Sequence, residues 1–277
     1  MSRPPACEPF RWVQLQRRLG LTCDALAPAR HVFTTRQWTL GSGLNESGWT
    51  EIAEAVGVDR TRLVRVQQVH AAGVLVVRHG DPLHPADDER RLREADIILS
   101  DDPTIAMAIQ TADCVPVIVL DRRSGVVAAV HAGWRGLAAR VPEAAVGALG
   151  RTFGSKPDDL TVVAGPSIGM CCYEVGEDVR QQFDQAAFAN AAIQRWFAPA
   201  RRPRHWYFDT WAATLDQVVA AGVPQSSVHI AGMCTASHPE VFCSYRRDGQ
   251  RAGRMAAVIR PISPGPWRHS PDDRRAR

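Results

Sequence analysis

Cys114 and His131 are the first pair of residues in this sequence whose types and spacing could support chemistry. They flank two short apolar segments, Val115–Leu120 and Val126–Val130, which the turn-like sequence DRRSG separates. Short apolar runs bounded by polar and glycine residues predict buried strands joined as a hairpin. If that hairpin is symmetric about the two arginines of its turn, Cys114 and His131 face each other at about 5 Å. Such a pair could share one metal ion, although a buried cysteine and histidine that only pack are the plainer alternative.

His70 is the candidate for a third ligand. It ends the segment Leu63–His70, whose side chains alternate roughly as in a strand, and a run of small residues (AAG) follows it. Two histidines and one cysteine, each at a strand end beside a small-residue loop, would form a three-ligand site. A catalytic zinc ion keeps such an open coordination position for water or substrate.

Arg36 and Arg135 are candidates for binding an anion such as phosphate. The segment His31–Arg36 predicts a short strand that ends in an arginine. Arg135 lies just before a predicted helix, Leu137–Leu149, and free backbone N–H groups at a helix start favour anions. Either arginine could instead be an ordinary surface residue. The pair Arg246–Arg247 could bind an anion or support the fold.

Three further sites are weaker candidates. Asp113, next to Cys114, could handle a proton or orient a ligand, or could simply cap a strand. The tandem Cys171 and Cys172 could bind a metal, but adjacent side chains of an extended chain point to opposite faces, which favours a packing role. His238 adjoins a proline in a loop and is expected at the surface rather than as a fourth metal ligand.

Composition sets the outer limits. The chain has 277 residues, of which 45% are hydrophobic and 22% charged, so it can bury a large core, and no break in composition divides it. A net charge of +4 is too small to indicate nucleic acid binding but would suit phosphate. Seven scattered cysteines and a first segment without an apolar secretion core predict a cytoplasmic protein. The longest apolar run falls short of about 18 residues, so no membrane span is predicted.

The pattern of apolar residues predicts mixed strands and helices in one domain. Residues 1–30 are expected to be a poorly ordered lead-in, residues 31–262 a single catalytic domain, and residues 263–277 a disordered tail. The loop 81–94 is expected at the surface. The helices expected beside Leu137–Leu149 are Trp49–Val56, with Ser47 or Thr50 as its cap, Glu177–Phe188 and Thr210–Ala221. The further strands expected are Val74–Val77, Asp96–Leu99, Ile105–Ile109, Leu160–Ala164, His205–Phe208, Ser227–Ala231 and Gly253–Ile259.

Six short motifs together resemble the laccase-domain family, formerly called multicopper polyphenol oxidoreductases. They are QVH at 68–70, TADCVPV at 111–117, VHAGWRG at 130–136, GPSIGMCCYEVG at 165–176, SYRRDG at 244–249 and GRMA at 253–256. The resemblance covers roughly residues 31–260. It implies an α+β fold, a single layered domain with mixed β-sheets packed together and helices on the outer faces. FTTR at 33–36 is similar to the family's FSTR, but the sequence after it is shorter than the family's loop, so Asn45 receives no role.

The resemblance also implies a function. It identifies His70, Cys114 and His131 as zinc ligands of a purine nucleoside phosphorylase that also has adenosine deaminase activity. The expected substrates are phosphate and adenosine, inosine or guanosine, with methylthioadenosine as a further candidate. Catalysis would use Cys114, Asp113 and Arg135, and Arg36 and Arg135 would bind substrate. Neither nucleic acid nor membrane is expected as a partner, and the protein is expected to be a monomer or a small homo-oligomer.

Of three other functions, one is disfavoured and two remain open at this point. Laccase chemistry is disfavoured, because a copper oxidase needs a three-copper cluster fed by about eight histidines besides its first site, and this chain has nine in all without an HxH pair. A cysteine hydrolase that edits peptidoglycan precursors could use Cys114 as nucleophile and His131 as base. A binding module with a structural metal would need a fourth ligand, such as Cys234 or His238, because structural zinc sites are closed.

Overall fold

The computed structural model describes residues 3–38, 40, 46–82 and 92–263, and within them the chain forms three sheets. The first has the strand order β1 (Phe10–Leu15), β2 (Arg18–Cys23), β3 (His31–Thr34), β15 (Met255–Ile259), β7 (Ala106–Thr111) and β4 (Leu63–Val64). The second has the order β14 (Val228–Ile230), β10 (Leu160–Ala164), β8 (Val115–Asp121), β9 (Val127–Ala132), β6 (Ile97–Ser100) and β5 (Val74–Val77). A small third sheet has the order β11 (Glu174–Gly176), β13 (His205–Phe208) and β12 (Phe197–Pro199).

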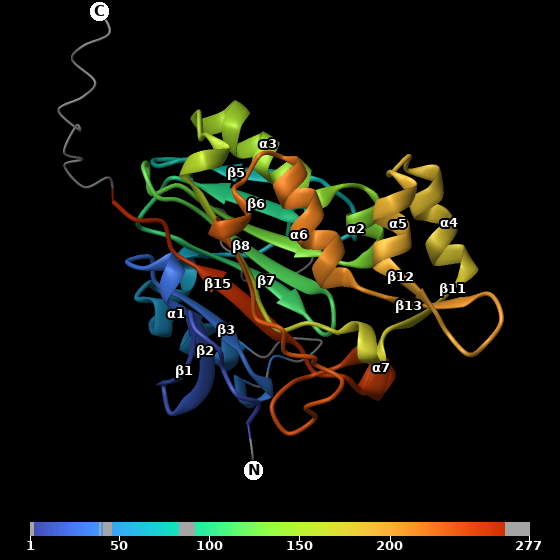
Figure 1. Ribbon diagram of the computed structural model, residues 1–277. Helices are drawn as coiled ribbons and strands as arrows, with labels where there is room; N and C mark the ends of the chain where they lie inside the picture. Colours follow the sequence, from blue (N-terminus) through green and yellow to red (C-terminus); the bar gives the residue numbers. More distant parts are fainter. Residues whose placement is uncertain (1–2, 39, 41–45, 83–91, 264–277) are drawn as a thin grey trace, which may run out of the picture.

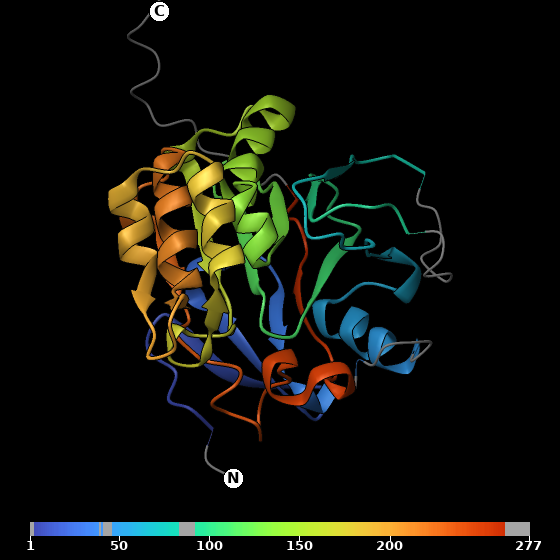
Figure 2. The same ribbon diagram turned by 90° about the vertical axis from the view of Figure 1, so that its right-hand side faces the viewer.

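The two large sheets pack face to face, and helices cover their outer faces (Figure 1, Figure 2). Helix α1 (Glu46–Val56) packs on the first sheet, and α3 (Val141–Phe153) and α6 (Thr210–Ala220) pack on the second. The remaining helices are α2 (Trp134–Ala138), α4 (Glu177–Gln185), α5 (Asn190–Trp196) and α7 (Tyr245–Asp248). The α+β fold with packed mixed sheets and outer helices is confirmed.

Burial on both faces explains why the central strands are apolar along most of their length. In β9, Val127 and Ala129 pack between the two sheets, whereas Ala128 and Val130 pack under the helices. Successive side chains of a strand point to opposite faces, so a strand between two cores needs an apolar residue at every position. β8 shows the same pattern, with all seven of its residues buried.

Two connections carry the chain from the first sheet to the second, and each carries one residue of the candidate site. Residues between β4 and β5 make one crossing, and those between β7 and β8 make the other. His70 lies on the first connection and Cys114 on the second. The two residues are therefore brought to the same end of the sheet pair by sheet packing and not by their distance along the sequence.

Several expected elements are confirmed. Val74–Val77, Leu160–Ala164 and His205–Phe208 are strands with the expected ends, and the other expected strands after residue 90 differ by one or two residues at their ends. Helix α6 begins at Thr210 as expected, with the carboxylate of Asp209 accepting hydrogen bonds from the N–H groups of residues 211 and 212. Such N-caps satisfy backbone donors that the helix leaves free.

The hairpin register was predicted wrongly by two residues. Val115 pairs with Ala132, and Pro116 pairs with His131, so His131 lies within β9 and does not directly face Cys114. The turn is centred one residue later than expected, because Gly125 adopts a positive φ of 78° and the Asp121 carboxylate accepts the N–H groups of residues 123 and 124. Glycine is the residue that takes such a conformation without steric cost.

Other expectations also need correction. The lead-in at residues 1–30 contains β1 and β2, an antiparallel hairpin at the edge of the first sheet. The segment before His70 is a strand only at Leu63–Val64, and the helix expected at Leu137–Leu149 is divided by Arg140, whose φ is 58°. Helix α1 begins at Glu46, so neither Ser47 nor Thr50 precedes it as a cap. Residues 264–277 of the expected tail, 83–91 of the loop, and Asn45 lie outside the described residues.

The search for membrane-spanning helices gave no candidate among the described residues, since none of their helices combines the necessary length with sufficient apolar character.

Candidate active site

The structure brings His70, Cys114 and His131 together. One nitrogen of each imidazole and the sulfur of the thiol all lie within 4.8 Å of one another. The two imidazole rings meet edge to face, with centroids 4.7 Å apart and an angle of 81°. His131 is buried, Cys114 is half-buried and His70 is exposed. The group thus has a closed side formed by β9 and an open side at His70.

Asp96, just before β6, positions both histidines. Its carboxylate lies 2.8 Å from Nδ1 of His131, which leaves Nε2 as the ring nitrogen that can face the thiol. The same carboxylate accepts the backbone N–H groups of Val69, His70 and Ala71 at 3.3, 3.1 and 2.7 Å. His70 has a positive φ of 59°, a conformation that non-glycine residues adopt only when other contacts hold them. Asp96 supplies those contacts.

The charges of the group are coupled. Burial by itself raises the pKa of the Cys114 thiol, but the imidazoles of His131 and His70 lower it to about 6. Burial likewise lowers the pKa of His131, and the Cys114 thiolate and the Asp96 carboxylate raise it to about 9. Cys114 is therefore a thiolate at neutral pH, which is the form that binds metals and attacks electrophiles.

Gly133 leaves room for this group. A Cβ atom at this position would meet Sγ of Cys114 and Cδ2 of His70, each at 3.0 Å. Both distances are at the lower limit of real carbon contacts, so any larger residue would push the thiol or the imidazole aside. The glycine of the motif VHAGWRG is thus required by the space around the two candidate ligands.

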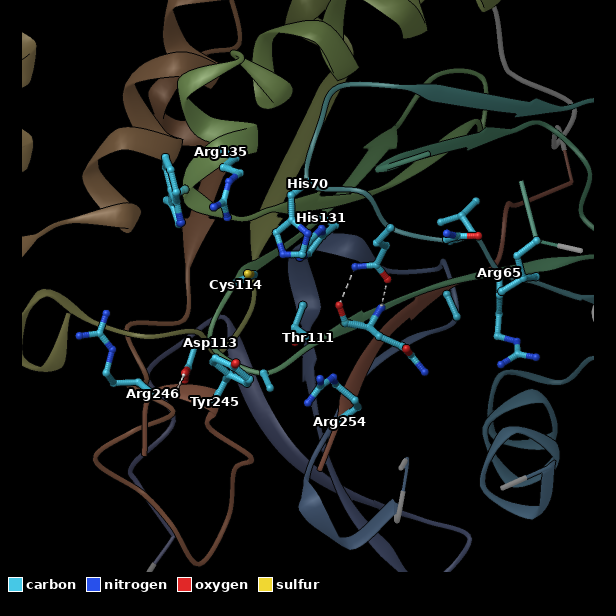
Figure 3. A pocket seen from close by; sticks show the side chains of 18 of the residues that line it. Arg65, His70, Thr111, Asp113, Cys114, His131, Arg135, Tyr245, Arg246 and Arg254 are labelled. Carbon is cyan, nitrogen blue, oxygen red and sulfur yellow. Dashed lines mark hydrogen bonds between the residues drawn. The ribbon is translucent and has the colours of Figure 1, made fainter. Parts of the chain in front are cut away.

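The three residues line a cavity of about 740 Å³ (Figure 3). Four arginines also line it, namely Arg65, Arg135, Arg246 and Arg254. Figure 3 shows Arg135, Arg246 and Arg254 on different sides of the thiol and the imidazoles. The wall also contains three aromatic residues (Trp134, Tyr173, Tyr245) and three glutamines (Gln67, Gln68, Gln110). A cavity of this size holds a small molecule, and its arginines favour an anionic one.

The arginine and glutamine side chains of the wall are held by neighbouring groups. The Arg135 guanidinium lies over the Trp134 ring, with 4.2 Å to its centroid, and that of Arg246 lies 5.0 Å from the ring centroid of Tyr173. The amide of Gln68 donates to the carbonyl of Gln110 at 2.8 Å and accepts its N–H at 2.7 Å. Ordered side chains lose less entropy when a ligand binds.

Asp113 serves the loop that carries Arg246. Its carboxylate accepts hydrogen bonds from the hydroxyls of Thr235 and Ser244, at 2.5 and 3.1 Å, and from the N–H of Arg246 at 2.6 Å. Its own φ is 92°. With three donors on its two oxygens, Asp113 fits a positioning role better than the proton-handling role that its place beside Cys114 suggested.

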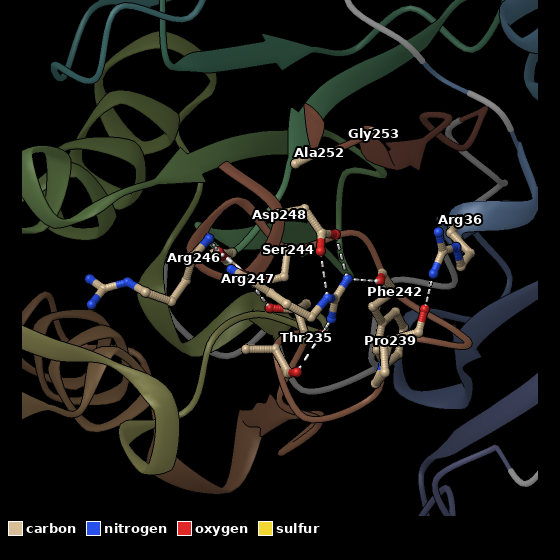
Figure 4. A network of polar contacts seen from close by, with 12 residues as sticks. Arg36, Thr235, Pro239, Phe242, Ser244, Arg246, Arg247, Asp248, Ala252 and Gly253 are labelled. Carbon is tan, nitrogen blue, oxygen red and sulfur yellow. Dashed lines mark hydrogen bonds and ion pairs between the residues drawn. The ribbon is translucent and has the colours of Figure 1, made fainter. Parts of the chain in front are cut away.

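Arg36 and Arg247 hold loops and do not line the cavity (Figure 4). The Arg36 guanidinium donates to the carbonyl of Pro239. The Arg247 guanidinium is bidentate with Asp248 and also donates to the carbonyls of Thr235, Ala236 and Phe242 at 3.0–3.3 Å. Of the adjacent pair of arginines, one therefore faces the cavity and the other supports the fold.

Of three expectations about neighbouring groups, two change and that for His238 does not. The helix expected to offer an anion site after Gly133 is α2, which has only five residues. His238 lies 3.8 Å from a carboxylate oxygen of Glu240 and is not part of the three-residue group. Cys171 and Cys172 lie on a 3-10 turn, Met170–Cys172, and not on an extended chain, so their sulfurs are only 3.7 Å apart. The premise that their side chains diverge was wrong.

Sequence reasoning missed Asp96 and most of the cavity wall. Asp96 is fully buried and precedes a fully buried strand, and buried carboxylates need specific partners. An acidic residue at the start of the run IILS was therefore a usable signal. Arg254, Tyr173 and Tyr245 gave no comparable signal, because arginine and tyrosine in loops are most often surface residues.

Comparisons with known proteins agree on one family. Residues 46–261 match the family model described as multi-copper polyphenol oxidoreductase laccase. The chain is 33% identical over 213 residues to a purine nucleoside phosphorylase of Bacteroides thetaiotaomicron, covering 76% of this chain and 77% of that protein. It is 41% identical over 181 residues to one of Pseudomonas aeruginosa, covering 65% and 70%.

A third relative carries a different name. It is called an adenosine deaminase and comes from an unknown prokaryotic organism, with 35% identity over 210 residues and coverage of 75% and 78%. Among solved structures, a hypothetical protein of Bacillus licheniformis superposes with a TM-score of 0.83 at 26% identity, covering 92% of this chain and 100% of that one. The likeness extends over nearly the whole fold.

Proposed function

Because this chain belongs to the family described as multi-copper polyphenol oxidoreductase laccase, we propose that it is a zinc-dependent purine nucleoside phosphorylase with adenosine deaminase activity. The names of its relatives support both activities. The substrates are phosphate and purine nucleosides such as adenosine, inosine and guanosine, with methylthioadenosine as a further candidate. The observation that carries the proposal is an open group of two imidazoles and a thiolate in an arginine-lined cavity.

The residues fit a zinc ion held by His70, Cys114 and His131. Imidazole nitrogen and thiolate sulfur are the usual zinc ligands, and three protein ligands leave one position open. The second nitrogen of His131 contacts the Asp96 carboxylate, an arrangement that fixes the ring of many zinc-bound histidines. When bound, zinc would supply Lewis-acid chemistry. Within the described residues this is the one candidate metal group that contains histidine, so the cluster of a copper oxidase has no counterpart there.

Phosphate binding is assigned to arginines of the cavity wall. Arg135, together with Arg246 and Arg254, would bind the phosphate oxygens and hold the anion for attack. A C1′–O bond then forms, the bond from C1′ to the purine nitrogen breaks, and that nitrogen takes up a proton. Arg36 is left out of this set because its guanidinium contacts Pro239, away from the lining residues.

The aromatic residues of the wall suit the purine. Trp134, Tyr173 and Tyr245 offer ring faces on which a flat base can stack. Tyr245 is 51% exposed, so its ring is free to cover a base that enters from solvent. In deamination, water adds its oxygen to C6 of adenosine and the amino group leaves as ammonia. The same cavity would hold the ribose while the base lies near the three-residue group.

One assay separates the two activities. Protein of known zinc content is incubated with inosine and with adenosine, with and without phosphate, and the products are separated. We expect hypoxanthine and ribose 1-phosphate from inosine only when phosphate is present, and inosine from adenosine without phosphate. If neither product forms with fully zinc-loaded protein, the proposal is wrong.

The second candidate is a cysteine hydrolase acting on peptidoglycan precursors. The lowered pKa of Cys114, about 6 beside His131, favours it, because a thiolate next to an imidazole is an activated nucleophile. Iodoacetamide would then abolish hydrolysis of a precursor while chelation would not. Nucleoside turnover that is lost when a chelator removes zinc would argue against the cysteine hydrolase.

A further inference from the structure

A second cluster of sulfur atoms lies outside the cavity. The thiols of Cys171, Cys172 and Cys234 all lie within 4.8 Å of one another. The first two sulfurs are 3.7 Å apart, and the hydroxyl of Ser237 lies 3.2 Å from Sγ of Cys172 and 3.7 Å from Sγ of Cys171. None of these residues lines the cavity described above. The nucleoside reaction therefore leaves the cluster without a role.

The cluster is assembled by two loops that are bound to each other. Ser167 and Cys234 form an isolated bridge, in which Ser167 N–H donates to the carbonyl of Met233 and Thr235 N–H donates to that of Ser167. Gly169 lies between the second loop and helix α6, since a Cβ atom there would lie 2.9 Å from the Trp211 ring and 3.4 Å from Cβ of Cys234. Its N–H donates to the Cys234 sulfur at 3.3 Å. The sulfur positions are thus set by backbone contacts.

The geometry points to a second metal site, and we propose that Cys171, Cys172 and Cys234 bind one thiophilic metal ion. Metal–sulfur bonds of about 2.3 Å place the sulfurs of a trigonal or tetrahedral site about 3.7–4.0 Å apart. The pair at 3.7 Å already has this spacing, and the third sulfur needs a shift of no more than about 1 Å.

The donor set decides which ions fit. Sulfur ligands without nitrogen or carboxylate favour Cu(I) and Zn(II) over hard cations. The Ser237 hydroxyl is close enough to complete a fourth position for zinc, whereas the three sulfurs alone would suit Cu(I).

Accessibility separates this cluster from buried cysteines that only pack. Cys171 is exposed, Cys172 is half-buried and Cys234 is buried, so an ion can enter from solvent and reach a sulfur fixed in the core. The loop also continues directly into Tyr173, which lines the cavity. A metal at the cluster would hold that part of the wall.

The test counts metal ions per chain. Reduced, metal-free protein is titrated without oxygen with Zn(II) in one arm and Cu(I) in the other, each against a chromophoric chelator. We expect two tightly held zinc equivalents in the natural protein and one in Cys171→Ser, an exposed position whose change should leave the fold intact. Cys114→Ser should also hold one, and this one should be lost when Cys171→Ser is added. Cys7→Ser, which removes another exposed cysteine, is the matched control and should hold two.

The two arms identify the ion. Copper(I) retained by Cys114→Ser and lost when Cys171→Ser is added would assign Cu(I) to the three-thiol cluster, and the same pattern with zinc alone would assign Zn(II). The proposal is overturned if folded Cys171→Ser and Cys172→Ser hold as many equivalents of both ions as the natural protein. The proposal is also overturned if Cys114→Ser holds neither ion, and that result leaves the nucleoside proposal standing.

Discussion

The carboxylate of Asp96 connects the two histidines of the cavity, which are 61 residues apart in the chain. It orients the ring of His131 and gathers three consecutive N–H groups around His70. Burial raises the pKa of this carboxyl, yet the hydrogen bonds from His131 and from the backbone lower it below its usual value. Asp96 is thus charged and fully buried. Its hydrogen-bond partners offset the free-energy cost of burying that charge.

Replacing Asp96 by asparagine should weaken metal binding at the cavity. Loss of a carboxylate behind a zinc-binding histidine typically costs about 10- to 100-fold in metal affinity, and the lost charged hydrogen bonds should cost about 1–3 kcal/mol of stability. Competition titration with a zinc chelator measures the first effect and urea unfolding the second. Asp121→Asn is the matched control, since Asp121 is equally buried and also accepts backbone N–H groups. Equal zinc affinities in the two variants would contradict the role given to Asp96.

At the scale of the element, His31 joins strands β2 and β3. Its Nε2 accepts the N–H of Cys23 at 2.8 Å, and its Nδ1 lies 2.8 Å from the carbonyl of Ala29. Because one ring nitrogen must accept a hydrogen bond, the ring is neutral in the folded protein. Burial lowers its pKa below the usual value, and this effect exceeds the opposing hydrogen bonds.

This strand contact makes stability depend on pH. Below a pH of about 6.5 the unfolded chain binds a proton at His31 more readily than the folded chain does, so the free energy of unfolding falls as the pH is lowered through that range. The slope from this one group is at most about 1.4 kcal/mol per pH unit. Urea unfolding at pH 7.5 and 5.5 should show a smaller loss for His31→Gln than for the natural protein.

His205→Gln is the control for that measurement. His205 also lies in a strand and its Nδ1 contacts the carbonyl two residues before it, at 2.9 Å, but its ring accepts no backbone N–H among the contacts of the described residues. We compare the fall in the free energy of unfolding between pH 7.5 and 5.5. If this fall is the same in His31→Gln, in His205→Gln and in the natural protein, His31 is not a source of the pH dependence.

At the scale of the whole molecule, the cavity lies where the chain crosses between the two large sheets. His70 and Cys114 are on the two connections that cross from the first sheet to the second, and His131 is on the second sheet. Arg246 and Arg254 precede β15 of the first sheet. A metal ion bound to the three ligands would therefore tie the crossings to the second sheet.

Metal removal should lower the stability of the whole fold. An ion that binds only the folded state stabilises it by about 2.7 kcal/mol when present at 100 times its Kd, which corresponds to roughly 5–10 °C in Tm for a chain of this size. Calorimetry of zinc-loaded and chelator-treated protein measures the difference. In His70→Ala, which lacks the exposed ligand, zinc should raise Tm by clearly less. An identical rise in both proteins would exclude binding at this group.

The sequence by itself determined the central strands and the identity of the three residues that meet. Continuous apolar runs such as Val115–Leu120 are stable between two cores, so their position follows from residue type. The three residues His70, Cys114 and His131 could likewise be recognised from their types and from the motifs around them. Arg36 was the exception, because a strand end does not specify where a long side chain points.

Only the tertiary structure decided how those residues are held and what surrounds them. Arg254 and Tyr245 become part of the site through contacts between segments distant in the chain, and such contacts leave no local pattern. Asp96 left a local signal, an acidic residue at the start of a buried strand, but not the identity of its partners. The hairpin register depended on the positive φ of Gly125, a choice between neighbouring turns that differ little in energy. The proximity of Cys171 and Cys172 to Cys234 required two loops to be pinned together, because spacing along the sequence carries no information about packing across it.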